Sequence, residues 1–404
     1  MKRLLLILLL CLAAGADEAY VGATLHPVSG PPVQTALVVR DGRIVGLSSP
    51  PAGAEVVSLQ GLHVYPAMID ADSALGLVEI AAVPPAMDIS EVGQVNPELR
   101  ADIAFHPDSK LIEVARSAGV LFAGVAPRGN PLSGQASVMR LIGWTREDMA
   151  VKAPVGLVVE WPDLALNRSP LAATPLEEQK ENRRLAVLRI QEAFANARAY
   201  RPALGQDVKW EAMQSALKGE SLVLVRAQRL DQIEAALELA RKEKLRLVLV
   251  GGADAWRVAG KLAERKVPVI YTEMLRLPRD HEAYDLYYRA PAVLAQAGVT
   301  VALSMGDDAS NTRWLPELAG RARAHGLSSE SALKSVTLNA ARILGVDDRL
   351  GSLEPGKEAT FIVTDGDLLE ADTHVLRAYV EGREIDLDDF QKKLYRRYRD
   401  RRKP

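Results

Sequence analysis

The feature that most constrains the fold is a series of short apolar runs that alternate with segments of helical periodicity. Several runs are almost continuously apolar, as expected of parallel strands buried on both faces. Eight strands with helices between them predict an α/β fold with a (β/α)₈, TIM-like barrel, although a short apolar run also fits a buried helix. The eight candidate strands are Val64–Ile69, Val120–Ala126, Ser137–Ile142, Gly156–Glu160, Leu222–Arg226, Leu245–Val250, Val267–Thr272 and Val299–Leu303.

Both ends of the chain have a different character, because short strand-like runs alternate there with turn residues. In residues 20–62, Asp41-Gly42 predicts a type I′ turn between two strands of a hairpin. Residues 351–383 contain further strand-like runs. A charged, alanine-rich segment at 174–201 predicts a long helix that packs outside the barrel or over its mouth.

The first 16 residues have the pattern of a signal peptide. Lys2-Arg3 precedes a short apolar run, and Ala14-Gly15-Ala16 fits a cleavage site. We therefore expect an exported protein, periplasmic or secreted; the alternative is an uncleaved anchor. The only cysteine, Cys11, lies in this segment, so the mature chain has no thiol for a disulfide, a metal or a nucleophile. The net charge of −2 argues against a nucleic-acid partner.

Several motifs carry a resemblance to a known family. These are the segment from Val64 to Gly76, Ser133-Gly134-Gln135-Ala136-Ser137 with Gly143-Trp144-Thr145, and, in the tail, Thr337 to Gly345 and Gly351 to Ala359. Together they resemble the amidohydrolase superfamily, in particular its exported imidazolonepropionase-like members. The resemblance implies a barrel at 63–345 beside a small β-sandwich formed by both chain ends, 17–62 and 346–388. It also implies hydrolysis of non-peptide C–N bonds in small molecules by one or two divalent metals such as zinc.

The positions that match the family's metal ligands hold other residues. The two histidines after strand one correspond to Asp72 and Ala74, and those after strands five and six correspond to Arg226 and Gly251. Gly306 stands at the family's aspartate, unless the turn is shifted by one residue to Asp307. Glu160 is the candidate acid at strand four, and the six histidines include no H-x-H pair. Arginine cannot ligate a metal, so we expect no zinc at the usual place.

Two hypotheses follow for these residues. The guanidinium of Arg226 could occupy the space of the lost metal, with Asp72, Asp307 or Glu160 as its anionic partners; the alternative is that Arg226 faces solvent or an outer helix. Asp307 and Asp308 could form a metal-free catalytic acid–base pair, although a solvated loop pair is the simpler interpretation.

Two functions remain open at this point. The chain is either a hydrolase with an unusual site, or an inactive barrel that binds a small molecule or pairs with an intact relative. The observation that would discriminate between them is whether the barrel mouth is open and polar or plugged by side chains. The family resemblance also implies a homodimer. The basic tail at 389–404 could contact an anionic surface, or it could be a solvated terminal helix.

Overall fold

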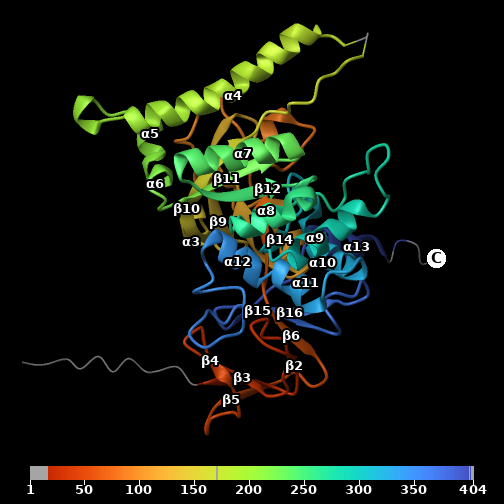
Figure 1. The fold of residues 1–404 in the computed structure, drawn as a ribbon. Helices are drawn as coiled ribbons and strands as arrows, with labels where there is room; N and C mark the ends of the chain where they lie inside the picture. The colour runs from red at the N-terminus through yellow and green to blue at the C-terminus, as the bar shows by residue number, and fades with distance from the viewer. Residues whose placement is uncertain (1–16, 170–171, 400, 402–404) are drawn as a thin grey trace, which may run out of the picture.

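A ring of eight strands forms the centre of the fold, and helices surround it (Figure 1). The structure is a computed structural model that describes residues 17–169, 172–399 and 401. The predicted signal peptide at 1–16 and the last residues of the basic tail lie outside the described residues. No helix in the described part of the chain is long and apolar enough to cross a membrane.

The barrel strands follow one another around the ring in chain order. They are β7 (Met68–Ser73), β8 (Val120–Val125), β9 (Leu132–Arg140), β10 (Ala150–Glu160), β11 (Leu222–Ala227), β12 (Arg246–Gly251), β13 (Val269–Tyr271) and β14 (Val301–Leu303). A parallel bridge between Ser73 and Gly306 joins the first strand to the end of the last, so the ring nearly closes. The predicted α/β barrel is therefore confirmed, and its apolar runs are the buried strands.

One strand departs from the parallel arrangement. β9 is antiparallel to both β8 and β10. Only residues 126–131 separate β8 from β9, which is too short for the crossover that a parallel connection needs. The chain therefore turns back through a loop at this point, and this loop carries a residue of the site described below.

The predicted strand Val64–Ile69 is divided between two sheets. Its first half belongs to β6 (His63–Pro66), which pairs with β15 (Phe361–Thr364) near the C-terminus. Its second half begins β7, and the carbonyl of Thr360 accepts a hydrogen bond from the N–H of Ala67 at the junction. The chain thus passes from the end sheets into the barrel within a few residues.

Two small sheets are built from both chain ends and lie beside the barrel, at the lower end of Figure 1. One contains β1 (Glu18–Val21), β3 (Ala36–Arg40), β4 (Arg43–Ser48) and β5 (Glu55–Ser58). The other contains β2 (Thr24–Leu25), β6, β15, β16 (Val375–Val380) and β17 (Arg383–Ile385). Asp41 and Gly42 both have positive φ, as the predicted type I′ turn requires. Side chains of both sheets, including Tyr20, Phe361 and Tyr379, share one apolar core.

The helices lie around the barrel. They are α1 (Ala101–Ala104), α2 (Lys110–Ser117), α3 (Arg146–Met149), α4 (Leu176–Ala199), α5 (Val208–Ala212), α6 (Gln214–Leu217), α7 (Leu230–Glu243), α8 (Ala259–Glu264), α9 (Leu286–Gln296), α10 (Leu315–Ala324), α11 (Ser329–Ser335), α12 (Leu338–Leu344) and α13 (Phe390–Arg399). The predicted helical insertion is α4, the long helix at the top of Figure 1. Ile190 and Phe194 in its second half are buried, whereas its first half is largely exposed.

A glycine in β8 allows the first two barrel strands to approach closely. A Cβ at Gly124 would lie 2.4 Å from the carbonyl oxygen of Ala71, in β7. We therefore expect Gly124→Ala to lower the free energy of unfolding by about 2 kcal/mol, because backbone must move to relieve the clash. Urea denaturation measures this. Gly46→Ala is the matched control, since nothing lies within 4 Å of its Cβ; equal midpoints for the two variants would contradict the expectation.

Candidate functional site

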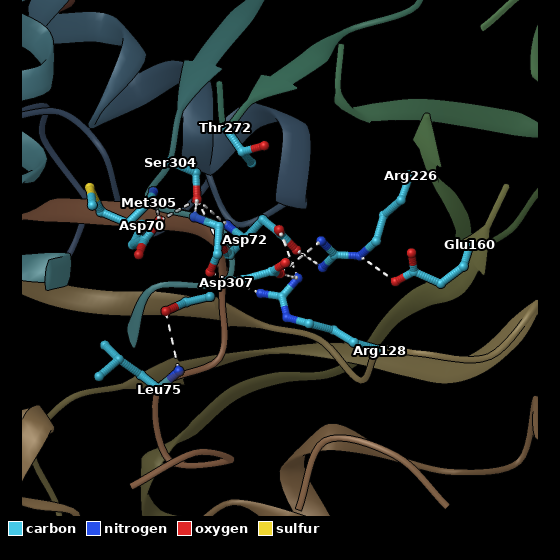
Figure 2. A network of polar contacts seen from close by, with 12 residues as sticks. Asp70, Asp72, Leu75, Arg128, Glu160, Arg226, Thr272, Ser304, Met305 and Asp307 are labelled. Carbon is cyan, nitrogen blue, oxygen red and sulfur yellow. Dashed lines mark hydrogen bonds and ion pairs between the residues drawn. The ribbon is translucent and has the colours of Figure 1, made fainter. Parts of the chain in front are cut away.

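A cluster of charged side chains lies where the barrel strands end (Figure 2). Asp72 comes from β7, Glu160 from the end of β10 and Arg226 from β11. Arg128 follows β8, and Asp307 follows β14. Parallel strands bring their carboxyl ends to one edge of the barrel, so residues far apart in the sequence meet at one mouth.

Asp72 lies at the centre of the cluster and is fully buried. Its Oδ1 accepts a hydrogen bond from Nη2 of Arg226, and its Oδ2 lies 3.2 Å from Nη1 of Arg128, which donates to it. Burial by itself would raise the pKa of this carboxyl, but the two guanidinium groups outweigh burial and hold the pKa below its usual 3.8. Asp72 is therefore an anion that two cations share.

Arg226 points into the barrel mouth, as one of the two sequence hypotheses expected. Besides its bond to Asp72, its Nε lies 3.1 Å from Oε1 of Glu160 and its Nη1 lies 3.8 Å from Oδ1 of Asp307. Burial disfavours the charged form, but these carboxylates outweigh burial and raise the pKa of the guanidinium. All three expected anionic partners are thus in contact with it, and the alternative of a solvent-facing Arg226 is wrong.

Arg128 is a part of this cluster that the sequence analysis missed. Its Nη1 lies 2.8 Å from Oδ1 of Asp307, and its Nη2 donates to the carbonyl oxygen of Gly306 at 3.0 Å. The available signal was its position two residues after the predicted strand Val120–Ala126, where barrel enzymes carry functional residues. Arg128 is thus a second cation among the carboxylates of the cluster.

Below the charged cluster, Asp70 of β7 forms a second buried network with the end of β14. Its Oδ1 accepts from the hydroxyl of Ser304 at 2.5 Å and from the N–H of Met305 at 3.2 Å, and its Oδ2 accepts from the hydroxyl of Thr312 at 3.2 Å. Burial raises the pKa of Asp70 to about 6. The hydroxyl of Ser304 also lies 2.6 Å from the carbonyl oxygen of Asp72. This network ties β7 to β14 beneath the site.

The residues at the other family ligand positions have no side-chain atom that could bind a metal. Ala74 and Gly251 line the mouth without a polar side chain. A Cβ at Gly251 would lie 2.4 Å from Nε2 of Gln228, so a histidine there would displace that amide. Gly306 has a φ of 65° and contributes its carbonyl oxygen to Arg128.

Asp307 and Asp308 have separate partners. The carboxylate of Asp307 contacts the two arginines of the cluster. That of Asp308 accepts from the hydroxyl of Ser310 at 2.7 Å and from Nδ2 of Asn311 at 2.6 Å, in the 3₁₀ helix Ala309–Trp314. Only Asp307 therefore joins the charged cluster, although both residues line the mouth.

The mouth contains a cavity of about 680 Å³, so side chains do not plug it. The cluster lies along one part of its wall, and apolar side chains, among them Val78, Met87 and Ile89, form another. No residue of α4 lines it, so the insertion stays outside this wall. The volume suits a small molecule.

The residues at this mouth do not fit a divalent metal. The described part of the chain holds no group of three or more histidine, cysteine or acidic side chains arranged for one. None of the six histidines lines the cavity. The carboxylates that do meet there are already neutralised in part by Arg128 and Arg226, and a guanidinium repels a dication and cannot ligate it.

Comparison with known proteins adds independent findings. Residues 262–391 match the amidohydrolase family. Amidohydrolase tasK of Hapsidospora irregularis is 21% identical over 384 residues, which are 87% of this chain but 39% of that protein. An imidazolonepropionase of Shewanella baltica is 54% identical over 39 residues, 10% of either chain. The crystal structure of an amidohydrolase from Thermotoga maritima is similar with a TM-score of 0.81 and 27% identity, covering 91% of this chain and 99% of that one.

Proposed function

We propose that this chain, which belongs to the amidohydrolase superfamily, binds a small molecule at its barrel mouth without a divalent metal. The observation that carries the proposal is the pairing of the buried Asp72 with both Arg128 and Arg226. Asp72 stands where the resemblance places the first metal-binding histidine. The guanidinium of Arg226 then supplies the positive charge that a metal would supply, in a form that organises carboxylates but cannot activate water by ligation.

Hydrolysis of a C–N bond is the second candidate, and one observation favours it. Glu160 lines the cavity, and burial raises its pKa although two arginines oppose the shift. Such a carboxylate could take the proton of a water that attacks a carbon of the substrate, and return that proton to the departing nitrogen as the C–N bond breaks. The Nε of Arg226 lies 3.1 Å from Oε1 of Glu160. The charge of this guanidinium would stabilise the negative charge that develops on the oxygen of the substrate's carbonyl group.

The subgroup within the superfamily and the cellular location of the protein are also part of this proposal. The motifs around Ser133 and Gly143 support an exported, imidazolonepropionase-like subgroup, and the pattern at 1–16 supports export to the periplasm or beyond. A homodimer, or a pair with a metal-competent relative, is the partner we propose by resemblance. The basic tail includes α13, on which Tyr395 and Tyr398 are exposed among lysines and arginines, a pattern that suits an anionic surface.

Metal content tests the proposed function directly. We expect the purified mature protein, produced with zinc, manganese and iron supplied, to carry far less than one metal ion per chain by plasma mass spectrometry. A chelator should leave its Tm unchanged. A metal bound only to the folded state would raise Tm, so removing such a metal would lower Tm. Asp308→Asn, whose carboxylate lies outside the cluster, is the control and should behave identically. One retained metal per chain, with a Tm that falls on chelation, would overturn the proposal.

A further inference from the structure

We propose that the cavity at the barrel mouth selects a small molecule with a protonated nitrogen group, such as an amine, an amidine or a guanidine, on an apolar body. The inference rests on the proposed function, because it names the ligand class of the same site. It follows from which polar atoms of the cluster a ligand can reach, and which are already used within the protein (Figure 2).

The reachable polar groups of the cluster are carboxylates. The side chain of Asp307 is 82% exposed and that of Glu160 is 30% exposed. Each contacts an arginine as an ion pair, but no described residue donates a hydrogen bond of good geometry to either carboxylate. Ionised carboxylates accept several hydrogen bonds, so both keep acceptor capacity for a donor in the cavity.

The cationic groups are largely withdrawn from the cavity. The side chains of Arg128 and Arg226 are 7% and 12% exposed. Their terminal nitrogens contact Asp72, Asp307 and the carbonyl of Gly306, and the Nε atom of each is buried. A ligand entering the mouth therefore meets acceptors before it meets donors.

The balance of charge supports the same choice. The cavity is lined by four acidic residues and two arginines; the acids are Glu160, Glu273, Asp307 and Asp308. One of the acids, Glu273, is paired with the positive charge of Arg276 at 2.9 Å. The buried Asp72, behind the lining, adds a negative charge that balances the charge of Arg276. The mouth thus carries an excess of negative charge, which attracts a cation and repels an anion.

The rest of the wall suits an apolar body beside that cation. Val78, Met87 and Ile89 line the cavity, and Ala74 leaves a methyl group where the family has an imidazole. Trp161 also lines it and is 6% exposed, and none of the described residues accepts a hydrogen bond from its indole N–H. Trp161 thus adds an aromatic ring to the lining, and aromatic rings are favourable neighbours for an organic cation.

Three probes of the same shape and different charge test this inference. Benzamidine is cationic at neutral pH, benzamide is neutral and benzoate is anionic. We expect benzamidine to raise Tm and to bind in calorimetry, more weakly as salt increases. Benzamide should bind more weakly than benzamidine, and the binding of benzoate should be undetectable.

Asp307→Asn and Glu160→Gln should each weaken benzamidine binding about tenfold, because each variant loses one charged hydrogen bond to the probe. Asp372→Asn is the matched control, because Asp372 is exposed and does not line the cavity, and it should change the affinity less than threefold.

Tighter binding of benzoate than of benzamidine would overturn the inference, and so would a benzamidine affinity that neither Asp307→Asn nor Glu160→Gln changes. Asp307 is exposed, so its variant decides the question even if Glu160→Gln fails to fold. The outcome is separate from that of the proposed function. A metal-loaded protein that binds benzamidine through Asp307 would refute only the metal-free proposal, and a metal-free protein that prefers benzoate would refute only the ligand class.

Discussion

Replacing Asp72 with asparagine is expected to lower the free energy of unfolding by about 3–5 kcal/mol, the usual cost of removing one partner from a buried ion pair. The substitution keeps the size of the side chain but leaves Arg128 and Arg226, both almost fully buried, without the buried carboxylate that they share. Chemical denaturation of the wild-type and variant proteins at neutral pH measures the effect.

Two further variants make this expectation specific. Asp307→Asn removes a carboxylate of the same cluster that is largely exposed, so it should cost less than about 1 kcal/mol. Arg226→Met added to Asp72→Asn should recover part of the loss, because it removes one of the two buried guanidinium groups that lose Asp72 as their partner. Equal effects of Asp72→Asn and Asp307→Asn would mean that the arginines are solvated and that Asp72 does not organise the site.

The second large effect depends on pH and concerns Asp70. Its pKa of about 6 in the folded protein lies above its ordinary value of 3.8, so the folded state binds this proton more tightly than the unfolded state. The ionised form therefore costs stability above pH 6, and this cost disappears as the pH falls from about 6 to about 4. A difference of roughly two units in pKa corresponds to about 3 kcal/mol.

Asp70→Asn isolates this contribution. The asparagine side chain does not titrate, so the difference in unfolding free energy between wild type and variant should change by about 3 kcal/mol between pH 7 and pH 4. The comparison cancels other groups in this range, such as His26, whose pKa burial lowers to about 4 and whose contribution has the opposite sign. A difference that stays constant with pH would show that the pKa of Asp70 is the same in the folded and the unfolded protein.

The sequence by itself determined the class of fold and one half of the site. Continuous apolar runs require burial on both faces, and a barrel with outer helices supplies that burial for eight of them. The type I′ turn at Asp41-Gly42 followed from local backbone preference alone. The sequence could suggest that Arg226 pairs with Asp72, because each lies at or just after the carboxyl end of a predicted strand. The carboxyl ends of barrel strands meet at one mouth.

Only the tertiary structure decided the remaining features, because each depends on partners that local pattern does not specify. The run at Val64–Ile69 is buried throughout, but hydrophobicity could not reveal that its two halves pair with different sheets. Arg128 reaches Asp72 from a loop, and the reach of a long side chain depends on the path of the backbone. The backbone after the turn at Gly306 directs Asp307 toward the arginines, while the carboxylate of Asp308 accepts from the side chains of Ser310 and Asn311. Adjacent acids in a sequence are equivalent until a turn separates them, and this turn decides which of the two joins the charged cluster.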